Sequence, residues 1–373
     1  MIRALHVIDK LSVDGSGIHG ISRALEWWAS NSDPTKVCFR ILSLRGREEE
    51  AAEFFAARGI DLQFVSVGKF DPRTIGVICR EARGWNADLL HLHGYASTNF
   101  GRIASRRLKI PNIVHEHVVF PSQPFVQRIA DRVLSRWTDS SLAISSAVAR
   151  FMIEERKVPQ ETLETFFYGI PFDEFEEPSD AAVEAARQEL GVPSNARIVV
   201  TAGRLAPQKG LDTLVQAFAK IPDELQAHLV IVGEGPDRER IEKLRKASGL
   251  ESRIHLVGFQ KDVRPWIAMA DVFAIASHYE GGPITLLEAM RLSRAIVTTP
   301  VGLVPEAIQD GKNGLQVPVG DEKALTDATV RILQNSDLRE SLGNAARQSS
   351  DQWDVRVAVK RLLAFYEKVL EKK

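Results

Sequence analysis

The chain has 373 residues, of which 44% are hydrophobic and 26% are charged, as is typical of a soluble globular protein with room for two domains. Its 48 basic and 49 acidic residues give a net charge of −1, which argues against nucleic acid as a partner. No apolar run reaches the roughly 20 residues needed to span a bilayer, and the N-terminus has no signal-peptide pattern. Cys38 and Cys79 lie in apolar stretches and are expected to be buried, reduced thiols. We therefore expect a cytoplasmic protein.

Short runs rich in Val, Ile and Leu alternate with helical stretches along most of the chain. Continuous apolar strands separated by helices indicate parallel sheets that are covered on both faces. The predicted strands of the first half are 4–8, 38–42, 63–67, 89–93, 112–115 and 142–144. Those of the second half are 198–202, 228–232, 254–257, 272–276 and 295–298.

The segment 171–180 is acidic, contains two prolines and lacks periodicity, so we interpret it as a linker. We expect a first domain at 1–180 and a second at 181–352, both α/β with a doubly wound parallel sheet. A last amphipathic helix, from about 353 to 370, is available to pack back on the first domain. Ligands bind such sheets at the carboxyl ends of their strands. Motifs that follow strands in the two domains are therefore expected to converge on one site.

The segment Glu280-Gly-Gly-Pro-Ile-Thr-Leu-Leu-Glu-Ala-Met290 follows a predicted strand and turns into an apolar helix. The N–H groups of the turn and of the helix N-terminus form an anion site. Glu288 lies in an apolar stretch, where an unpaired charge is costly, and it is suited to accept hydrogen bonds from sugar or ribose hydroxyls. A solvated helix glutamate is the alternative for Glu288 taken alone.

Another strand is followed directly by Gly203-Arg-Leu-Ala-Pro-Gln-Lys-Gly210, before a predicted helix at 211–220. This loop presents Arg204 and Lys209, a pair that suits a diphosphate. Arginine can clamp two oxygens, while lysine supplies a mobile point charge. The alternative is that both cations are simply solvated on the loop. This alternative is less favoured because the Glu280 segment of the same domain offers acceptors for ligand hydroxyls facing the same crevice.

These motifs, with Val232-Gly-Glu-Gly-Pro236 between them, resemble glycosyltransferase family 4, the retaining nucleotide-sugar enzymes of the GT-B fold. The resemblance covers nearly the whole chain and is most specific at 200–315. It implies two Rossmann-like domains that face a central cleft. It also implies retaining transfer of a sugar from a nucleoside diphosphate sugar, with UDP-sugar as the expected donor. The implied acceptor is a glycan or lipid-linked hydroxyl in polysaccharide or glycolipid biosynthesis. No cofactor is expected, and no metal either, because cations hold the diphosphate.

The resemblance also implies roles for individual residues. Arg204 and Lys209 would hold the diphosphate, Glu288 the ribose hydroxyls, and Glu280 the transferred sugar. His117 matches a family histidine near the reacting carbon, so the expected catalytic residues are His117, Glu280, Arg204 and Lys209. Further donor contacts are expected from Ser16, Gly17, His93, Val257, Gly258, Phe259, Gly281, Gly282, Pro283 and Ile284. Gly282 departs from the pattern, since many members have an aromatic residue there.

Gly15-Ser-Gly-Ile-His-Gly20 fits the Gly-x-Gly-x-x-Gly pattern of dinucleotide-binding proteins. The match is weak, because residues 9–14 separate it from the preceding strand and no acidic residue ends a strand about twenty residues on. In the family, a glycine-rich loop in this place approaches the donor phosphates. Many members have paired glycines followed by Ala-Glu, so the role of His19 stays open.

The pairs His91-x-His93 and His115-x-His117 each place two imidazoles on one face of a strand end. A zinc site is the alternative, but no aspartate or cysteine accompanies the pairs at ligand spacing. Glu116 should point away from its two neighbours. We expect His91 and His115 to be core or supporting residues.

Residues 100–137 are rich in arginine and lysine, and their second half has apolar residues at helical spacing. The basic residues are Arg102, Arg106, Arg107, Lys109, Arg128, Arg132 and Arg136, and the apolar ones are Phe125, Ile129, Val133 and Trp137. A basic amphipathic helix can lie on an anionic membrane surface, and a solvated helix face is equally compatible with the pattern. Peripheral contact with the inner membrane face is therefore a hypothesis.

Three other functions fit parts of the sequence. A nucleotide-sugar epimerase would share the architecture but lacks the Glu280–Glu288 pattern. An NAD-dependent dehydrogenase rests only on the displaced glycine motif. A non-catalytic nucleotide-sugar-binding protein would have the same motifs without turnover.

Overall fold

The computed structural model describes residues 1–12, 20–119 and 125–372. The chain forms two compact units, one made of Met1–Ile170 with Trp353–Lys373 and the other of Pro171–Gln352. The second unit thus begins before the expected boundary at 180. The acidic segment stays with this unit because the Arg291 guanidinium lies 4.3 Å from the centre of the Phe172 ring.

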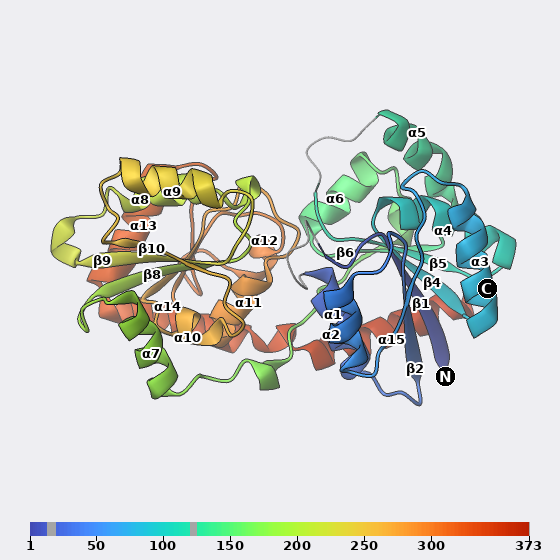
Figure 1. Cartoon of the computed structure of the whole chain (residues 1–373), viewed down its shortest axis with the longest axis horizontal. Helices are drawn as coiled ribbons and strands as arrows, with labels where there is room; N and C mark the ends of the chain where they lie inside the picture. The colour runs from blue at the N-terminus through green and yellow to red at the C-terminus, as the bar shows by residue number, and fades with distance from the viewer. Residues whose placement is uncertain (13–19, 120–124, 373) are drawn as a thin grey trace. The chain divides into compact units, whose positions relative to one another are not determined.

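The first unit contains a sheet of seven strands in the order β3-β2-β1-β4-β5-β6-β7, and neighbouring strands pair in parallel (Figure 1). The order reverses between β1 and β4, which makes this pair the switch point of a doubly wound sheet. The strands are β1 (Ile2–Ile8), β2 (Val37–Ser43), β3 (Asp61–Phe64), β4 (Leu89–His93), β5 (Asn112–Glu116), β6 (Ser140–Ala143) and β7 (Leu163–Thr165). The helices are α1 (Ile21–Ser30), α2 (Glu49–Ala56), α3 (Arg73–Trp85), α4 (Tyr95–Leu108), α5 (Phe125–Leu134), α6 (Ser146–Glu154) and α15 (Val355–Glu371).

The second unit contains a parallel sheet of six strands in the order β10-β9-β8-β11-β12-β13, with its switch point between β8 and β11. The strands are β8 (Arg197–Ala202), β9 (Ala227–Val232), β10 (Ile254–Gly258), β11 (Val272–Ile275), β12 (Ile296–Thr298) and β13 (Leu315–Gln316). The helices are α7 (Asp180–Leu190), α8 (Leu211–Phe218), α9 (Arg238–Ala247), α10 (Arg264–Ala268), α11 (Ile284–Arg291), α12 (Val304–Ala307), α13 (Glu322–Gln334) and α14 (Ser336–Ser349).

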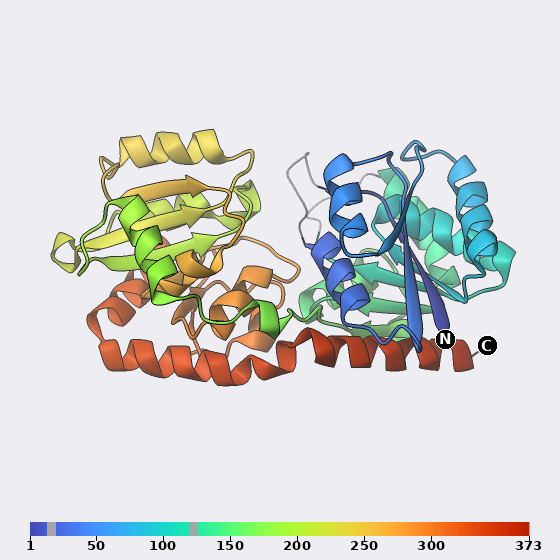
Figure 2. The ribbon, with the colours of Figure 1, turned by 60° about the horizontal axis from the view of Figure 1, so that its bottom comes forward.

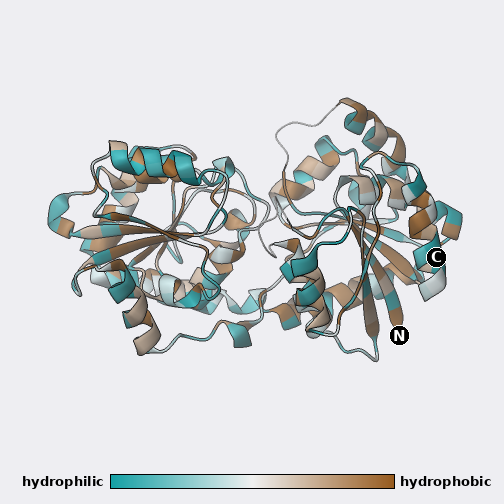
Figure 3. Ribbon diagram, in the orientation of Figure 1, coloured by the Kyte–Doolittle hydropathy of each residue, from teal (hydrophilic) through white to brown (hydrophobic). Residues whose placement is uncertain are grey.

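Both sheets confirm the expected α/β class. Every residue of β4, β5 and β6 is buried, so these strands need helices on both faces. The sheets are largely hydrophobic, whereas the helices carry both polar and apolar stretches (Figure 3). The sequence did not predict β7 and β13, which have three and two residues, too few for a recognisable apolar run. β3 was expected at 63–67, and its partly polar sequence, typical of a sheet edge, obscured its true start.

The C-terminal helix α15 belongs to the first unit and runs along it (Figure 2). Ile170 and Trp353 are joined by a backbone hydrogen bond of 2.9 Å just before the helix begins. Tyr366 on α15 is completely buried, and its hydroxyl reaches side chains of two central strands. The buried aromatic face of α15 therefore holds it against the sheet.

Within the described residues, no helix combines the length and the apolar composition that crossing a bilayer requires. Both cysteines are free thiols. Cys79 is buried as expected, whereas Cys38 is only partly buried.

Candidate functional site

The two motif-bearing loops of the second unit follow the two strands of its switch point. β8 and β11 are neighbours, with Val272 level with Val199 and Phe273 level with Val200. The loop after β8 carries Arg204 and leads through a short turn to α8, and the loop after β11 leads through residues 276–283 to α11. Because the carboxyl ends of parallel strands lie at one edge of the sheet, the topology brings these loops together where α/β sheets bind ligands.

The structure pairs two charges that the sequence presented in separate motifs. The Lys209 Nζ lies 2.6 Å from Oε1 of Glu280, and the Ser277 hydroxyl donates a 2.9 Å hydrogen bond to the same oxygen. Both charged side chains are largely buried, with 21% of Lys209 and 12% of Glu280 exposed. The carboxylate thus holds the ammonium group in a defined place beside the cavity.

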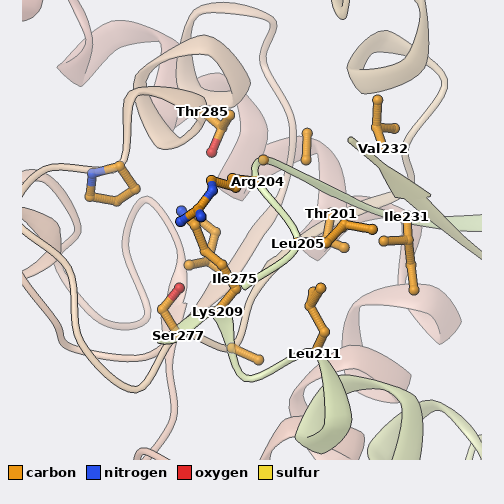
Figure 4. A pocket seen from close by; sticks show the side chains of 14 residues that line it. Thr201, Arg204, Leu205, Lys209, Leu211, Ile231, Val232, Ile275, Ser277 and Thr285 are labelled. Atoms are coloured by element: carbon orange, nitrogen blue, oxygen red, sulfur yellow. The ribbon is translucent and has the colours of Figure 1, made fainter. Parts of the chain in front are cut away.

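A small, partly open cavity lies between the two loops (Figure 4). Arg204 and Lys209 line it together with the hydroxyl-bearing side chains of Thr201, Ser277 and Thr285. In Figure 4 the nitrogen-bearing ends of Arg204 and Lys209 lie between Ser277 and Thr285, while Thr201 lies farther away beside apolar side chains of the wall. Two cations flanked by hydroxyl donors can bind an anion such as a diphosphate.

The sequence patterns did not identify Ser277 and Thr285 as residues of this site. Both flank the Glu280 turn, Ser277 after β11 and Thr285 as the second residue of α11. A hydroxyl at a strand's carboxyl end or in the first helical turn is a weak signal, because serine and threonine are common there for capping reasons. Only the shared cavity wall distinguishes these two.

Two glycines allow the loops to approach this closely. Gly210 has φ +57°, and a Cβ there would lie 2.1 Å from the carbonyl oxygen of Ala276. Gly233, in the motif between β9 and α9, has φ +132°, and its Cβ would lie 1.9 Å from the carbonyl oxygen of Gly203. Any side chain at either position would push the backbone of one cavity loop away.

The other site residues predicted in the second unit differ in their burial and in whether they line the cavity. Pro283 lines the cavity and precedes Ile284, the first residue of α11. Glu288 lies on α11, is 4% exposed and is not part of the cavity wall. The 257–259 loop ends β10, which β9 separates from β8, and Phe259 is 64% exposed.

His93 and His117 lie in the first unit, at the end of β4 and just after β5. His93 is 1% exposed, and its Nδ1 lies 2.9 Å from Nε2 of His117. Burial lowers the pKa of His117 to about 3, so its imidazole is neutral at physiological pH. Ser16, Gly17 and His19 lie outside the described residues.

His6 of β1 was not recognised in the sequence, yet it lies level with His91 across the sheet. A single histidine in an apolar strand carries no motif, so only strand pairing could place it beside the others. Nitrogens of His6, His91 and His93 lie within 4.8 Å of one another, as do those of His93, His115 and His117. These two triplets are the histidine groups in the described part of the chain that have metal-ligand proximity.

Comparison with known proteins supports the family resemblance. Residues 182–349 match the family described as Glycosyl transferases group 1, and residues 37–174 match Glycosyltransferase Family 4. The N-acetyl-alpha-D-glucosaminyl L-malate synthase of Bacillus anthracis is 28% identical over 275 residues, which cover 71% of this chain and 70% of that protein. The alpha-D-kanosaminyltransferase of Streptomyces kanamyceticus is 29% identical over 296 residues, covering 74% and 75%.

Solved structures share the fold along the whole chain. Anabaena HepE in complex with UDP has a TM-score of 0.85 at 20% identity, with 98% of this chain and 100% of that chain covered. Sucrose-phosphate synthase from Thermosynechococcus elongatus has a TM-score of 0.83 at 18% identity, with both chains fully covered. The matched sequence regions together span most of the chain, which belongs to glycosyltransferase family 4 and is a glycosyltransferase of the GT-B fold.

Proposed function

We propose that this protein transfers a hexosyl or related residue from a UDP-sugar to an acceptor hydroxyl with retention of anomeric configuration. The observation that carries the proposal is the cavity at the switch point of the second unit, where Arg204 and Lys209 face hydroxyl-bearing side chains. A role in polysaccharide or glycolipid biosynthesis is part of the proposal. UDP is favoured because the similar protein HepE has been solved with UDP and with UDP-glucose.

In this proposal the leaving diphosphate is the group that the protein stabilises. The acceptor oxygen forms a bond to the anomeric carbon on the face from which the diphosphate oxygen departs, and the acceptor proton passes to the leaving phosphate. Arg204 and Lys209 neutralise the charge that develops on the diphosphate, while the protein otherwise supplies position. A close pair of carboxylates, as in a retaining glycosidase, is not required.

Glu280 and His117 have separate roles in the proposal. Glu280 holds Lys209 through the 2.6 Å ion pair and is assigned to the transferred sugar. His117 is assigned to the donor sugar near its reacting carbon, and Glu288 to the ribose hydroxyls. Neither a cofactor nor a divalent metal takes part, because the two cations compensate the diphosphate charge.

Calorimetric titration with UDP, GDP and ADP, each with and without EDTA, tests the donor site. We expect one nucleotide to bind independently of metal, and the Arg204→Ala/Lys209→Ala variant to lose that binding. Lys220→Ala/Lys323→Ala removes two exposed lysines of the same unit and should bind normally. Binding that survives the loss of Arg204 and Lys209, or that requires Mg²⁺, would contradict the proposed site.

Turnover distinguishes the alternatives once a nucleotide is identified. Each single cation variant should lose about 2–4 kcal/mol of transition-state stabilisation, by analogy with removal of one oxyanion donor. An epimerase would convert the donor without any acceptor, and a sensor would bind the donor without turnover. Binding of NADH would favour the dehydrogenase.

We further propose that α5 lies on an anionic membrane surface. Its exposed side carries four apolar residues, Phe125, Val126, Ile129 and Val133, with exposed fractions of 67%, 65%, 49% and 45%. Arg128, Arg132 and Arg136 are the exposed basic residues at 125–137, whereas Arg102, in the first half of the basic stretch 100–137, is fully buried. An outward face that combines apolar and cationic residues is suited to the headgroup region of a bilayer.

Buried charges explain why this helix presents its apolar residues outward. Asp131 of α5 is fully buried, with its Oδ2 2.6 Å from Nε of Arg156 and its Oδ1 3.5 Å from Nη1 of Arg102. Arg156 also pairs with the buried carboxylate of Glu116. These ion pairs hold the side of α5 that carries Asp131 against the protein, so the apolar side faces the solvent.

Vesicle sedimentation tests this contact. Each arginine near an anionic surface contributes about 1 kcal/mol, so Arg128→Gln/Arg132→Gln/Arg136→Gln should weaken partitioning onto phosphatidylglycerol vesicles roughly 100-fold. The control triple variant replaces Arg47, Arg73 and Arg80, which are 63%, 85% and 70% exposed in the same unit. Equal pelleting of the α5 variant and the wild type would exclude α5 as the membrane contact.

A further inference from the structure

Five histidines and two tyrosines of the first unit form one continuous chain of hydrogen bonds. Four of the histidines lie in β1, β4 and β5, where His6 is level with His91 and His93 with His115, and His117 follows β5 directly. In order, the bonded atoms are Tyr168 OH and His117 Nδ1, His117 Nε2 and His93 Nδ1 (2.9 Å), His93 Nε2 and His6 Nδ1 (2.9 Å), His6 Nε2 and Tyr366 OH (3.2 Å), Tyr366 OH and His91 Nδ1 (2.7 Å), and His91 Nε2 and His115 Nδ1 (3.1 Å).

All five imidazoles are held neutral by their surroundings. Burial lowers the pKa of His6 and His117 to about 3, and it lowers the pKa values of His91, His93 and His115 well below the ordinary value. A neutral imidazole has one N–H donor and one acceptor nitrogen. Each histidine that donates on one side must therefore accept on the other. Tyr366 passes the direction on, because a hydroxyl that accepted from both His6 and His91 would leave its own hydrogen without a partner among the described residues. All members of the chain then donate in the same direction.

This one-way rule leaves two arrangements, and unsatisfied groups decide between them. If Tyr168 donates to His117, every histidine carries its proton on Nε2, and one group is left over, the N–H of His115 Nε2. That nitrogen is buried and has no partner in the described part of the chain. In the reverse arrangement, every proton is on Nδ1, and both the His115 lone pair and the Tyr168 hydroxyl hydrogen lack partners among the described residues. The first arrangement leaves fewer buried groups unsatisfied.

A shared metal ion fits these rings less well than hydrogen bonds do. His91 stacks on His93 with centroids 4.4 Å apart and planes inclined by 25°, so their lone pairs lie in nearly parallel planes. The ring nitrogens already pair with one another at 2.9–3.1 Å. Zinc would need lone pairs from three rings to converge on one point.

We propose that this chain fixes His117 as the Nε2–H tautomer, with its Nδ1 lone pair turned toward Tyr168. His6, His91, His93, His115 and Tyr366 are then positioning residues rather than groups that touch a substrate. The fixed tautomer makes His117 a hydrogen-bond acceptor at Nδ1, where a sugar hydroxyl could compete with Tyr168. That last consequence rests on the proposed function, whereas the tautomer itself does not.

Nitrogen-15 NMR of the histidine side chains in the full-length protein at neutral pH tests the proposal. In the wild type, the assigned signals of His6, His91, His93, His115 and His117 should all be of the Nε2–H type, and none of these five should be protonated. Tyr168→Phe removes the hydroxyl that sets the direction, so all five should populate both tautomers, including His115 at the far end. Tyr366→Phe cuts the chain, so only His91 and His115 should become mixed. Tyr95→Phe, a tyrosine outside the chain, should change no tautomer.

The outcomes are distinguishable. Mixed or Nδ1–H tautomers at any of these five histidines in the wild type would overturn the proposal, and so would a His115 that does not respond to Tyr168→Phe. Stoichiometric zinc in the purified protein, measured by elemental analysis, would overturn it in favour of a metal centre. Failure of UDP to bind the wild type would count against the proposed function alone, because the tautomers are read without nucleotide.

Discussion

The position of Lys209 depends on the residue that follows it. Gly210 lets the loop after β8 pass so close to β11 that the amide of His278 donates a 2.7 Å hydrogen bond to the carbonyl of Gln208. This backbone contact and the Glu280 carboxylate together place the Lys209 ammonium at the cavity. The sequence predicted the cation and the carboxylate, but not that they form a pair.

Gly210→Ala should therefore destabilise the second unit and weaken nucleotide binding. The new Cβ would meet the carbonyl oxygen of Ala276 at 2.1 Å, in addition to the strain of a positive φ that itself costs about 1–3 kcal/mol. Gly191→Ala is the matched control, since Gly191 has φ +65° and nothing within 4 Å of the added carbon. Urea unfolding of the two variants measures the difference. Equal losses would mean that the close approach to Ala276 does not matter.

At the scale of elements, α5 is held by charge rather than by an apolar face. In an ordinary surface helix, the apolar residues that α5 exposes would face the protein core. The sequence pattern showed an amphipathic helix but not which side faces the protein. The buried arginines that decide it, Arg102 and Arg156, lie on or next to α4 and α6, far from α5 in sequence.

Asp131→Ala should destabilise the first unit by about 3–5 kcal/mol, because it leaves buried arginine charge without its partner. Glu164→Ala is the control, since that carboxylate pairs with Lys368 at the surface and is 47% exposed. An exposed pair of this kind contributes about 0–1 kcal/mol. Chemical unfolding of both variants measures the two losses. A similarly small decrease in the free energy of unfolding for both variants would show that the buried ion pairs are not what holds α5 in place.

At the scale of the molecule, four histidines buried in the first sheet, with the partly buried His117 next to them, make the stability of the first unit depend on pH. His6 has a folded-state pKa of about 3, below the ordinary value of an unfolded histidine, because burial disfavours its charged form. The unfolded chain therefore takes up protons first as pH falls. The contribution that the neutral, buried imidazole makes to the free energy of unfolding is fully present above about pH 6.5. It is lost progressively as the pH falls toward 3.

We expect the free energy of unfolding of the first unit to fall by about 1.4 kcal/mol per pH unit for each such histidine below pH 6. Urea unfolding between pH 7.5 and 5 measures this slope, and His6→Gln should make it shallower. A flat stability over this range would contradict neutral burial of the histidines.

The sequence by itself determined the α/β class, the two parallel sheets and the presence of two cations in the loop after β8, because apolar strands and glycine-bounded turns are local patterns. Other features depended on which strands become neighbours. The Lys209–Glu280 pair exists because β8 and β11 are adjacent, and His6 joins the other histidines because β1 lies beside β4. The outward face of α5 follows from a buried carboxylate whose partners lie elsewhere in the chain. Long-range pairing leaves no signal within a short segment, so only the tertiary structure could decide these features.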